Sequence, residues 1–388
     1  MNNRFPYSRQ SLDKRDIQSV IKTLKADIIT RGKTINNFES NICKFVNSKF
    51  SVVVNSATSA LHIACMALNI KKNDLVWTVP NTFVATPNSA VYCGAKIDFV
   101  DIEESTGNLD VKKLEEKLKK TKKKPKLLIP VHFAGQPTDQ EKIYKLSKKY
   151  NFKILEDASH SLGASRNGNK VGNCKWSDIT VFSFHPVKII TSGEGGAATT
   201  NSKKLIEKMK LFRNHGVTKD LNLMKNKKKD KWYYEQLELG YNYWMSDINA
   251  SLGSSQLKKT NSFIIKRNKI AKTYNKELKD MPIQLPLIKK ENYSSYHLYV
   301  IKLKSKSKKL YNNIFRSFIS SNMDVNLHYL PAHLHPFYKK FGFKKGQFPV
   351  SESHADRAIS IPIYYDLSKK NQIKIIKNIK KILLKYVL

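Results

Sequence analysis

The sequence has 388 residues, 40% of them hydrophobic, which is long enough for two folded domains with separate cores. Its formal net charge of +39 comes mostly from lysine in scattered runs, without an arginine-rich stripe or zinc knuckle, so we expect no nucleic-acid partner. No apolar run of about 18 residues and no secretory leader occur, which argues against a membrane span, and four widely spaced cysteines fit a reducing cytoplasm.

The first seventy residues predict two helices followed by a strand and a third helix. Apolar residues recur at helical spacing over 12–26 and 34–46. The β-branched run 50–54 predicts a strand that ends in the polar turn 55–59, and a helix is expected over 60–68. A strand, a tight polar turn and a helix N-terminus together form a geometry that binds anions.

Strands and helices then alternate as far as residue 200. Strands are predicted at 75–79, 95–100, 127–131, 152–156, 179–183 and 195–200. Helices are predicted at 82–92, at 111–119 and from the loop 132–137 to about Tyr150. This alternation predicts an α/β domain around a largely parallel sheet, which binds ligands beyond the carboxyl ends of its strands.

The pattern changes after residue 257, so we expect a large α/β domain over 1–257 and a smaller α+β domain over 258–388. The second domain is predicted to contain helices at 261–278, 309–320 and 369–387, a strand at 296–303 and a short extended segment at 325–327. The segment 218–231 is rich in lysine and poor in apolar residues, which predicts a mobile loop.

Two polar motifs follow predicted strands. The turn Ser56-Ala57-Thr58 offers hydroxyls and backbone N–H groups to a phosphate, although such turns more often only cap a helix. Asp157 directly follows the apolar strand 152–156 and needs either solvent or a cationic partner. A protonated pyridine nitrogen is one such partner, and a helix cap or rim acid is the plain alternative.

A third motif places Lys188 shortly after the strand 179–183 and before a glycine-rich turn at 193–196. In a cleft near other cations the pKa of this lysine would fall, which favours Schiff-base chemistry, whereas an exposed lysine is the default alternative. A fourth motif, 240–247, combines aromatic and polar residues before a small-residue helix at 248–257, and simple packing could also explain it.

In this order the motifs resemble the DegT/DnrJ/EryC1/StrS family of pyridoxal phosphate (PLP) dependent sugar aminotransferases. The resemblance rests on NSATSALH at 55–62, PNTFVAT at 80–86, EDASHSLGA at 156–164, SFHPVKIITSGEGGAATT at 183–200, FRNHG at 212–216 and LGYNYWMSDINASLGSSQL at 239–257. It implies the fold type I architecture of aspartate aminotransferase and a homodimer with shared active sites.

The resemblance also assigns roles to individual residues. Lys188 corresponds to the lysine that binds PLP as a Schiff base, and Asp157 to the acid that pairs with the pyridine nitrogen. Phe83 corresponds to the aromatic residue that stacks on the ring, and His160 to a catalytic-site histidine close to the cofactor. The phosphate positions are Ser56, Ala57, Thr58 and Ser183, with Asn242 reaching the cofactor of the neighbouring subunit.

A closer resemblance within the family concerns the amino terminus and the segment NLHYLPAHLHPFY at 326–338. It is to transaminases that move an amino group from L-glutamate to C4 of a UDP-4-keto-6-deoxy-N-acetylhexosamine in pseudaminic acid biosynthesis. It implies a sugar-nucleotide pocket formed by Tyr7, Asp27, Ile28, Ile29, Thr30, His185, Asn326, Leu327, His328 and Tyr329.

Other functions stay open at this point. Pro186, Tyr241, Tyr243 and Trp244 depart from the pattern of those transaminases, so a GDP- or dTDP-linked keto sugar is an alternative substrate. Some family members carry histidine in place of the lysine and act as dehydratases, and Lys188 favours transamination instead. A non-catalytic binding protein and a basic nucleic-acid-binding protein are the alternatives of other classes.

The four cysteines form no CxxC pair, so no metal is expected.

Overall fold

The computed structural model describes residues 4–226 and 230–387. Its centre is a seven-stranded sheet in the order β1-β9-β8-β5-β4-β2-β3, in which all strands except β9 run in the same direction. These strands are β1 (Phe50–Val54), β2 (Leu75–Thr78), β3 (Lys96–Phe99), β4 (Leu127–Ile129), β5 (Lys153–Asp157), β8 (Ile179–Ser183) and β9 (Gly196–Thr200). The predicted, mainly parallel α/β fold is therefore confirmed.

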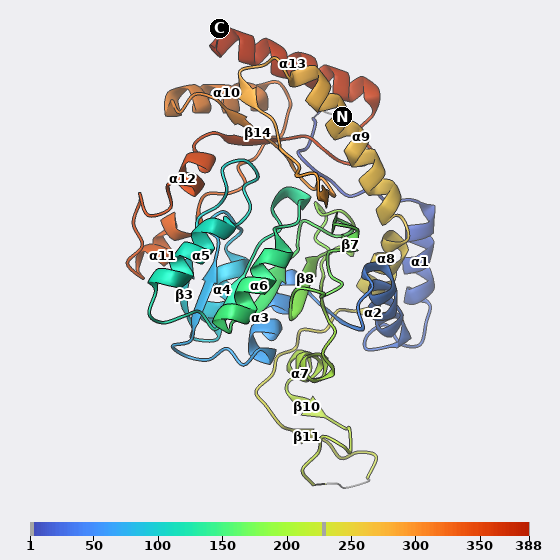
Figure 1. Ribbon diagram of the computed structural model, residues 1–388. Helices are drawn as coiled ribbons and strands as arrows, with labels where there is room; N and C mark the ends of the chain where they lie inside the picture. Colours follow the sequence, from blue (N-terminus) through green and yellow to red (C-terminus); the bar gives the residue numbers. More distant parts are fainter. Residues whose placement is uncertain (1–3, 227–229, 388) are drawn as a thin grey trace.

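Helices cover both faces of this sheet (Figure 1). They are α1 (Lys14–Leu24), α2 (Lys33–Val46), α3 (Ala57–Ala67), α4 (Ala85–Tyr92), α5 (Val111–Lys120), α6 (Gln140–Tyr150), α7 (Lys203–Arg213) and α8 (Asp247–Leu257). Val52 and Val54 of β1 pack in a core shared with α3, α4 and α7, whereas Val53 packs in a core shared with α2 and α8. This is the two-residue alternation of a strand that is buried on both faces.

A second sheet belongs to a C-terminal lobe, which lies at the top of Figure 1. The sheet contains β12 (Ile283–Gln284), β14 (Tyr299–Leu303) and β15 (Ala358–Ile361) in antiparallel order. The helices of this part are α9 (Thr260–Leu278), α10 (Lys308–Ser320), α11 (Pro336–Lys339), α12 (Pro349–Ala355) and α13 (Lys369–Val387). Its core joins α9, α10 and α13 to β14 and β15, and Phe5 near the amino terminus packs there too.

The predicted domain boundary at 257/258 coincides with the junction of α8 and α9. However, Phe263 and Ile264 at the start of α9 pack with α2 and α8, whereas residues from Ile270 onward pack in the C-terminal core. Because α9 contributes to both cores, the boundary stays a prediction.

Several elements differ from the prediction. Helix α3 begins at Ala57 because the Ser56 side chain caps it by accepting a hydrogen bond from the Ser59 N–H at 3.1 Å. Strand β14 begins at Tyr299, since Tyr296 has a φ of +46° that does not fit a strand. The sequence did not predict α7, α12 or β15. Nor did it predict a small sheet of β6 (Ser165–Arg166), β7 (Asn169–Lys170) and β13 (Asn292–Tyr293).

The described residues of the predicted loop 218–231 form part of an arm that projects from the molecule beyond α7 (Figure 1). The arm contains an antiparallel pair, β10 (Val217–Thr218) and β11 (Glu235–Gln236). Residues 227–229 lie outside the described residues, so the mobility of this loop stays a prediction. Among residues 4–226 and 230–387, no helix is both long and apolar enough to cross a membrane.

Candidate active site

A cavity of about 460 Å³ lies at the carboxyl ends of β5 and β8, a size typical of small-molecule sites. The predicted site residues that line it are Tyr7, Ser56, Ala57, Thr58, Phe83, Asp157, His160, Ser183, His185, Lys188, Asn326, Leu327, His328 and Tyr329. They come from both lobes. The structure thus brings together residues more than 300 positions apart in the sequence.

Asn242 and the segment 27–30 do not line the cavity of their own chain. Both are exposed, and the segment 27–30 contacts the start of α8, five residues after Asn242, where the Asp247 N–H donates a hydrogen bond to the Ile29 carbonyl at 3.0 Å. In this position they could contribute to a site only across an interface with another subunit.

The N-terminus of α3 forms one end of the cavity. Ser56 is the N-cap residue, so the plain alternative of a capping serine is correct, but Ala57 and Thr58 in the first turn also face the cavity. Gly196 of β9 lies against this turn, and a Cβ atom there would come within 2.5 Å of the Ala57 nitrogen. The glycine therefore lets the sheet and the helix N-terminus approach closely and form a cradle for an anion.

Asp157 lies at the end of β5 and is 6% exposed. Its carboxylate accepts hydrogen bonds from the Thr86 hydroxyl at 2.7 Å and from the Ser159 N–H and hydroxyl at 3.0 and 2.6 Å. In the part of the chain that the structure describes, the hydrogen-bond donors to this side chain are all neutral. The geometry excludes a rim acid and leaves a buried carboxylate that can accept a protonated nitrogen from a ligand.

Lys188 follows β8, and its side chain is half-buried in the cavity wall. Desolvation by burial lowers its pKa from 10.5 to about 8, an effect that the charge of Asp157 partly offsets. About a tenth of this lysine is therefore a free amine at pH 7 and about half at pH 8, as a nucleophile or a general base requires.

His160 and Tyr329 form a hydrogen-bonded pair in the cavity wall. The His160 Nε2 atom lies 2.9 Å from the Tyr329 hydroxyl, and its Nδ1 atom accepts a hydrogen bond from the Ala134 N–H at 3.3 Å. Burial lowers the pKa of His160 well below its usual value, and the charge of Lys188 lowers it further. The imidazole is therefore neutral.

Sequence reasoning gave no role to five polar residues that line the cavity: Thr82, Thr86, Ser159, Glu194 and His297. His297 is 1% exposed, and its ring centroid lies 4.4 Å from that of His160. It stands in an apolar run, where a histidine usually has only a packing role. Glu194 lies within the motif GEGG, and its carboxylate lies 3.9 Å from the exposed His185 ring. The motif GEGG indicates a functional turn, but only its glycines, and not Glu194, have a role in the sequence analysis.

A site with a buried carboxylate, a free lysine amine and an anion cradle on a mainly parallel sheet defines a PLP-dependent enzyme of the aspartate aminotransferase class. The model of the DegT/DnrJ/EryC1/StrS aminotransferase family matches residues 10–380. The chain belongs to this family and is a PLP-dependent aminotransferase.

Individual relatives agree with this assignment. The chain is 40% identical over 367 residues to the UDP-4-amino-4,6-dideoxy-N-acetyl-beta-L-altrosamine transaminase of Campylobacter jejuni serotype O:2, covering 94% of each protein. It is similar in structure to Helicobacter pylori PseC, an aminotransferase of pseudaminic acid biosynthesis, with a TM-score of 0.91, 33% identity and coverage of 99% and 100%. The PLP form of the putative sugar aminotransferase Spr1654 from Streptococcus pneumoniae gives a TM-score of 0.90 at 26% identity, with coverage of 99% and 100%.

The residues of the cavity fit PLP. The buried Asp157 carboxylate lacks a cationic hydrogen-bond donor among the described residues, and a pyridinium nitrogen would supply one. The cradle at Ala57 and Gly196 suits the phosphate, and Lys188 suits the aldehyde. In the same described ranges, no group of three or more His, Cys, Asp or Glu side chains is arranged to bind a metal ion.

Proposed function

We propose that this enzyme moves an amino group from L-glutamate to C4 of a UDP-4-keto-6-deoxy-N-acetylhexosamine and so forms UDP-4-amino-4,6-dideoxy-N-acetyl-β-L-altrosamine. The observation that carries transamination is the free amine of Lys188 in one cavity with the buried Asp157 carboxylate. The similarity to the Campylobacter transaminase over almost the whole chain supports the choice of sugar. Tyr7 and the segment 326–329 provide the wall that would contact it.

In the proposed mechanism Lys188 holds the cofactor and then acts as the acid and base of the reaction. PLP, when bound, supplies an electron-accepting ring beside the reacting carbon. Asp157 keeps the proton on the pyridine nitrogen, because its buried charge favours the pyridinium form. The Nζ atom of Lys188 takes the proton from the amino-bearing carbon of glutamate and later returns a proton to C4 of the sugar.

Other residues position the cofactor and the substrates. Ser56, Ala57, Thr58 and Ser183 would hold the phosphate, and Phe83 would cover one face of the ring. Phe83 is 60% exposed, so a ligand stacked on it would cover apolar surface. His160 would lie beside the ring as a neutral hydrogen-bond donor.

A panel of keto sugars tests the choice of substrate. The enzyme would be converted to its aminated form with glutamate and mixed in turn with UDP-, GDP- and dTDP-linked 4-keto sugars. We expect the UDP-linked N-acetylated sugar to have a kcat/KM at least about tenfold above the others, because a site that hydrogen-bonds an N-acetyl group discriminates strongly against sugars without one. A higher value for a GDP- or dTDP-linked sugar would replace this proposal with a perosamine-type activity.

We also propose a homodimer in which Asn242 and the segment 27–30 complete the site of the neighbouring subunit. Helix α1 supports this arrangement because it buries only two side chains, both polar, and exposes its isoleucines and its leucine. Asp16 and Thr23 pack inward, and Asp16 accepts hydrogen bonds from Ser255 and Gln256 of α8 at 2.7 and 2.8 Å. The apolar residues that α1 and its neighbouring loops expose are Leu12, Ile17, Ile21, Leu24, Ile28 and Ile29, each between 44% and 61%.

A cytoplasmic location completes the proposal. The four cysteines, Cys43, Cys65, Cys93 and Cys174, are all free, which is typical of proteins in a reducing compartment. Fractionation of the producing cells, with the enzyme detected by antibody, tests this location. Recovery outside the cytoplasm would contradict it.

A further inference from the structure

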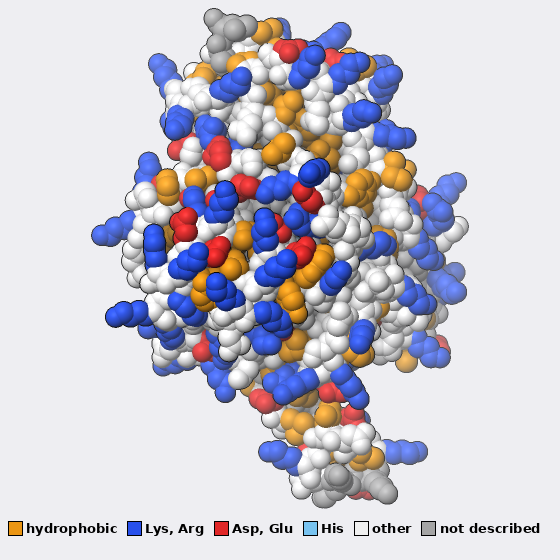
Figure 2. Space-filling model, in the orientation of Figure 1, with side chains coloured by type: hydrophobic (Ala, Val, Ile, Leu, Met, Phe, Trp, Pro, Cys, Tyr) orange, Lys and Arg blue, Asp and Glu red, His pale blue; other side chains and the backbone are white. Residues whose placement is uncertain are grey.

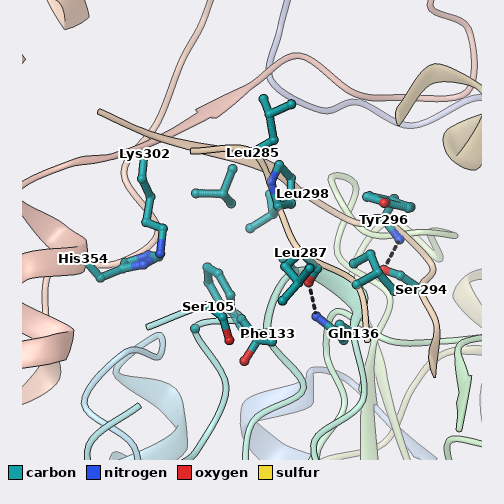
Figure 3. A pocket seen from close by; sticks show the side chains of 16 residues that line it. Ser105, Phe133, Gln136, Leu285, Leu287, Ser294, Tyr296, Leu298, Lys302 and His354 are labelled. Carbon is teal, nitrogen blue, oxygen red and sulfur yellow. Dashed lines mark hydrogen bonds between the residues drawn. The ribbon is translucent and has the colours of Figure 1, made fainter. Parts of the chain in front are cut away.

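The segment 294–300 of the C-terminal lobe separates the active-site cavity from a smaller cavity of about 30 Å³. Its even-numbered residues, Ser294, Tyr296, Leu298 and Val300, line the smaller cavity, and Figure 3 shows the first three near Phe133 and Gln136. His297 lies between them in the sequence and lines the active-site cavity. This segment therefore forms part of the active-site wall and also contacts the loop that contains Phe133.

That loop has a left-handed backbone, which the segment 294–298 holds in place. Ala134 has a φ of +56°, which is unusual for a residue other than glycine, and Gly135 has a φ of +101°. The Ser295 N–H donates a hydrogen bond to the Gly135 carbonyl at 3.0 Å, and the Leu298 N–H donates to the Ala134 carbonyl at 3.3 Å. Such a conformation persists only when its surroundings determine it, and it often occurs at functional sites.

One consequence of the left-handed turn is the direction of the Ala134 N–H. This group donates a hydrogen bond to the His160 Nδ1 atom at 3.3 Å. Ser295 fixes the other side of the histidine, because its hydroxyl donates to the His160 carbonyl at 2.8 Å. A backbone N–H can only donate, so Nδ1 must be the unprotonated nitrogen of the neutral ring.

The position of that proton determines the role of Tyr329. In neutral His160 the remaining proton is on Nε2, which donates to the Tyr329 oxygen at 2.9 Å. Burial raises the pKa of Tyr329, as does the charge of Asp157, so the phenol keeps its proton. Since its oxygen already accepts the bond from His160, the Tyr329 O–H is left to donate to another acceptor, and Tyr329 lines the cavity.

We propose that the Ala134 amide fixes the His160 tautomer, and that this tautomer makes the Tyr329 hydroxyl a hydrogen-bond donor to an oxygen of the keto sugar. The inference rests on the proposed function. The acceptor proposed is a carbonyl or hydroxyl oxygen of the sugar, because Tyr329 belongs to the segment 326–329, whose four residues all line the cavity. Ala134 and His160 act here as positioning residues.

The tautomer can be measured without substrate or cofactor. In the full-length apoenzyme with ¹⁵N-labelled histidine, the His160 signals are those that disappear in His160→Gln. We expect a protonated Nε2 and an unprotonated Nδ1 between about pH 6 and 8, because the ring is neutral there. A protonated Nδ1 or an imidazolium ring in this range would overturn the inference, whatever the activity of the enzyme.

The role of Tyr329 is tested by measuring the two half-reactions separately by absorbance. Tyr329→Phe removes only the hydroxyl, so we expect the sugar half-reaction to slow at least about tenfold more than the glutamate half-reaction. Equal losses in both would mean that the hydroxyl serves the cofactor, which overturns the inference. If the wild-type enzyme aminated no UDP-linked keto sugar, the proposed function itself would fail, and the tautomer measurement would still stand.

A matched pair of substitutions at His160 tests the polarity. In His160→Gln the amide oxygen can accept from Ala134 while its NH₂ group donates to Tyr329, as the histidine does. In His160→Glu both carboxylate oxygens accept, so Tyr329 would donate its proton to the glutamate instead. We expect the ratio of the sugar to the glutamate half-reaction to be at least about tenfold higher for Gln than for Glu. Equal ratios would contradict the proposed relay.

Discussion

At the scale of single residues, Lys188 and Asp157 differ in what surrounds their charges. Burial lowers the pKa of Lys188 to about 8, whereas Asp157 is held by three hydrogen bonds from Thr86 and Ser159. The lowered pKa favours the neutral amine of the lysine, and the buried carboxylate can pair with a cation. This division of roles is what an aminotransferase needs from the two residues.

Replacing Asp157 by asparagine tests the charge without changing the shape of the side chain. The amide can still accept a hydrogen bond from Thr86, so we expect the fold to be kept. The glutamate half-reaction should slow by about 100-fold or more, because the negative charge that holds the pyridinium proton is lost. Stopped-flow absorbance measures this rate. Asp178→Asn, on a partly exposed carboxylate that pairs with Lys153, is the control.

The pKa of Lys188 predicts how PLP attachment to the apoenzyme depends on pH. Only the free amine reacts, so the rate should rise about tenfold per pH unit below pH 8 and level off above it. A lysine at the ordinary pKa of 10.5 would give a rate that keeps rising to about pH 10. Absorbance after mixing with PLP follows the reaction, and Lys188→Ala shows the background.

The chemical roles of Lys188 and Asp157 could be predicted from the sequence because each residue follows a strand and belongs to a specific motif. His297 could not, because it lies in an apolar run and reaches the cavity only through the packing of the segment 294–298 against Gly135. Asn242 is exposed on its own chain, and its expected contact with a neighbouring subunit stays a prediction.

At the scale of elements, the contact between β9 and α3 positions the anion cradle. Strand β9 runs antiparallel to β8 and β1, so its first residue, Gly196, lies beside the N-terminus of α3. The sequence predicted both elements but not their relative direction, because hydrophobic patterns do not distinguish parallel from antiparallel neighbours. The close approach could be anticipated only from the glycine itself.

Gly196→Ala should weaken cofactor binding. The added Cβ atom would lie 2.5 Å from the Ala57 nitrogen and 2.6 Å from the Ser56 carbonyl, so the helix N-terminus must move. We expect the free energy of unfolding to fall by about 1–3 kcal/mol and the Kd for PLP to rise at least about tenfold. Thermal denaturation and PLP titration measure the two effects. Gly168→Ala, where nothing lies within 4 Å, should leave PLP affinity unchanged.

The outward apolar face of α1 is a second feature at this scale. Introducing charge with Ile17→Glu and Ile21→Glu should convert the proposed dimer to monomers and lower PLP occupancy, because both side chains are about half exposed in the single chain. Light scattering after gel filtration measures the mass. Lys22→Glu changes charge on the same helix and should leave the mass unchanged. A persistent dimer in the isoleucine variant would place the interface elsewhere.

At the scale of the whole molecule, the two lobes share the active-site cavity. Tyr7 and residues 326–329 reach it from the C-terminal side, while the anion cradle and Lys188 belong to the main sheet. Composition indicated two cores, but the sequence could not show that α9 joins them.

The positive charge is distributed over the molecule, and Figure 2 shows Lys and Arg side chains spread across the visible face without one dominant patch. Such a surface attracts anionic substrates generally but does not define a nucleic-acid site.

The measurement that tests the central claim most directly is the absorbance spectrum of the PLP-loaded enzyme before and after glutamate. We predict a band at roughly 400–430 nm, because Lys188 binds PLP covalently. The band should shift to about 330 nm when glutamate is added, because transamination converts the cofactor to its amine form. Lys188→Ala should show neither the bound-state band nor the shift, whereas Lys203→Ala, on an exposed lysine of α7, should show both. A wild-type spectrum that does not respond to glutamate, or a full response in Lys188→Ala, would contradict this account.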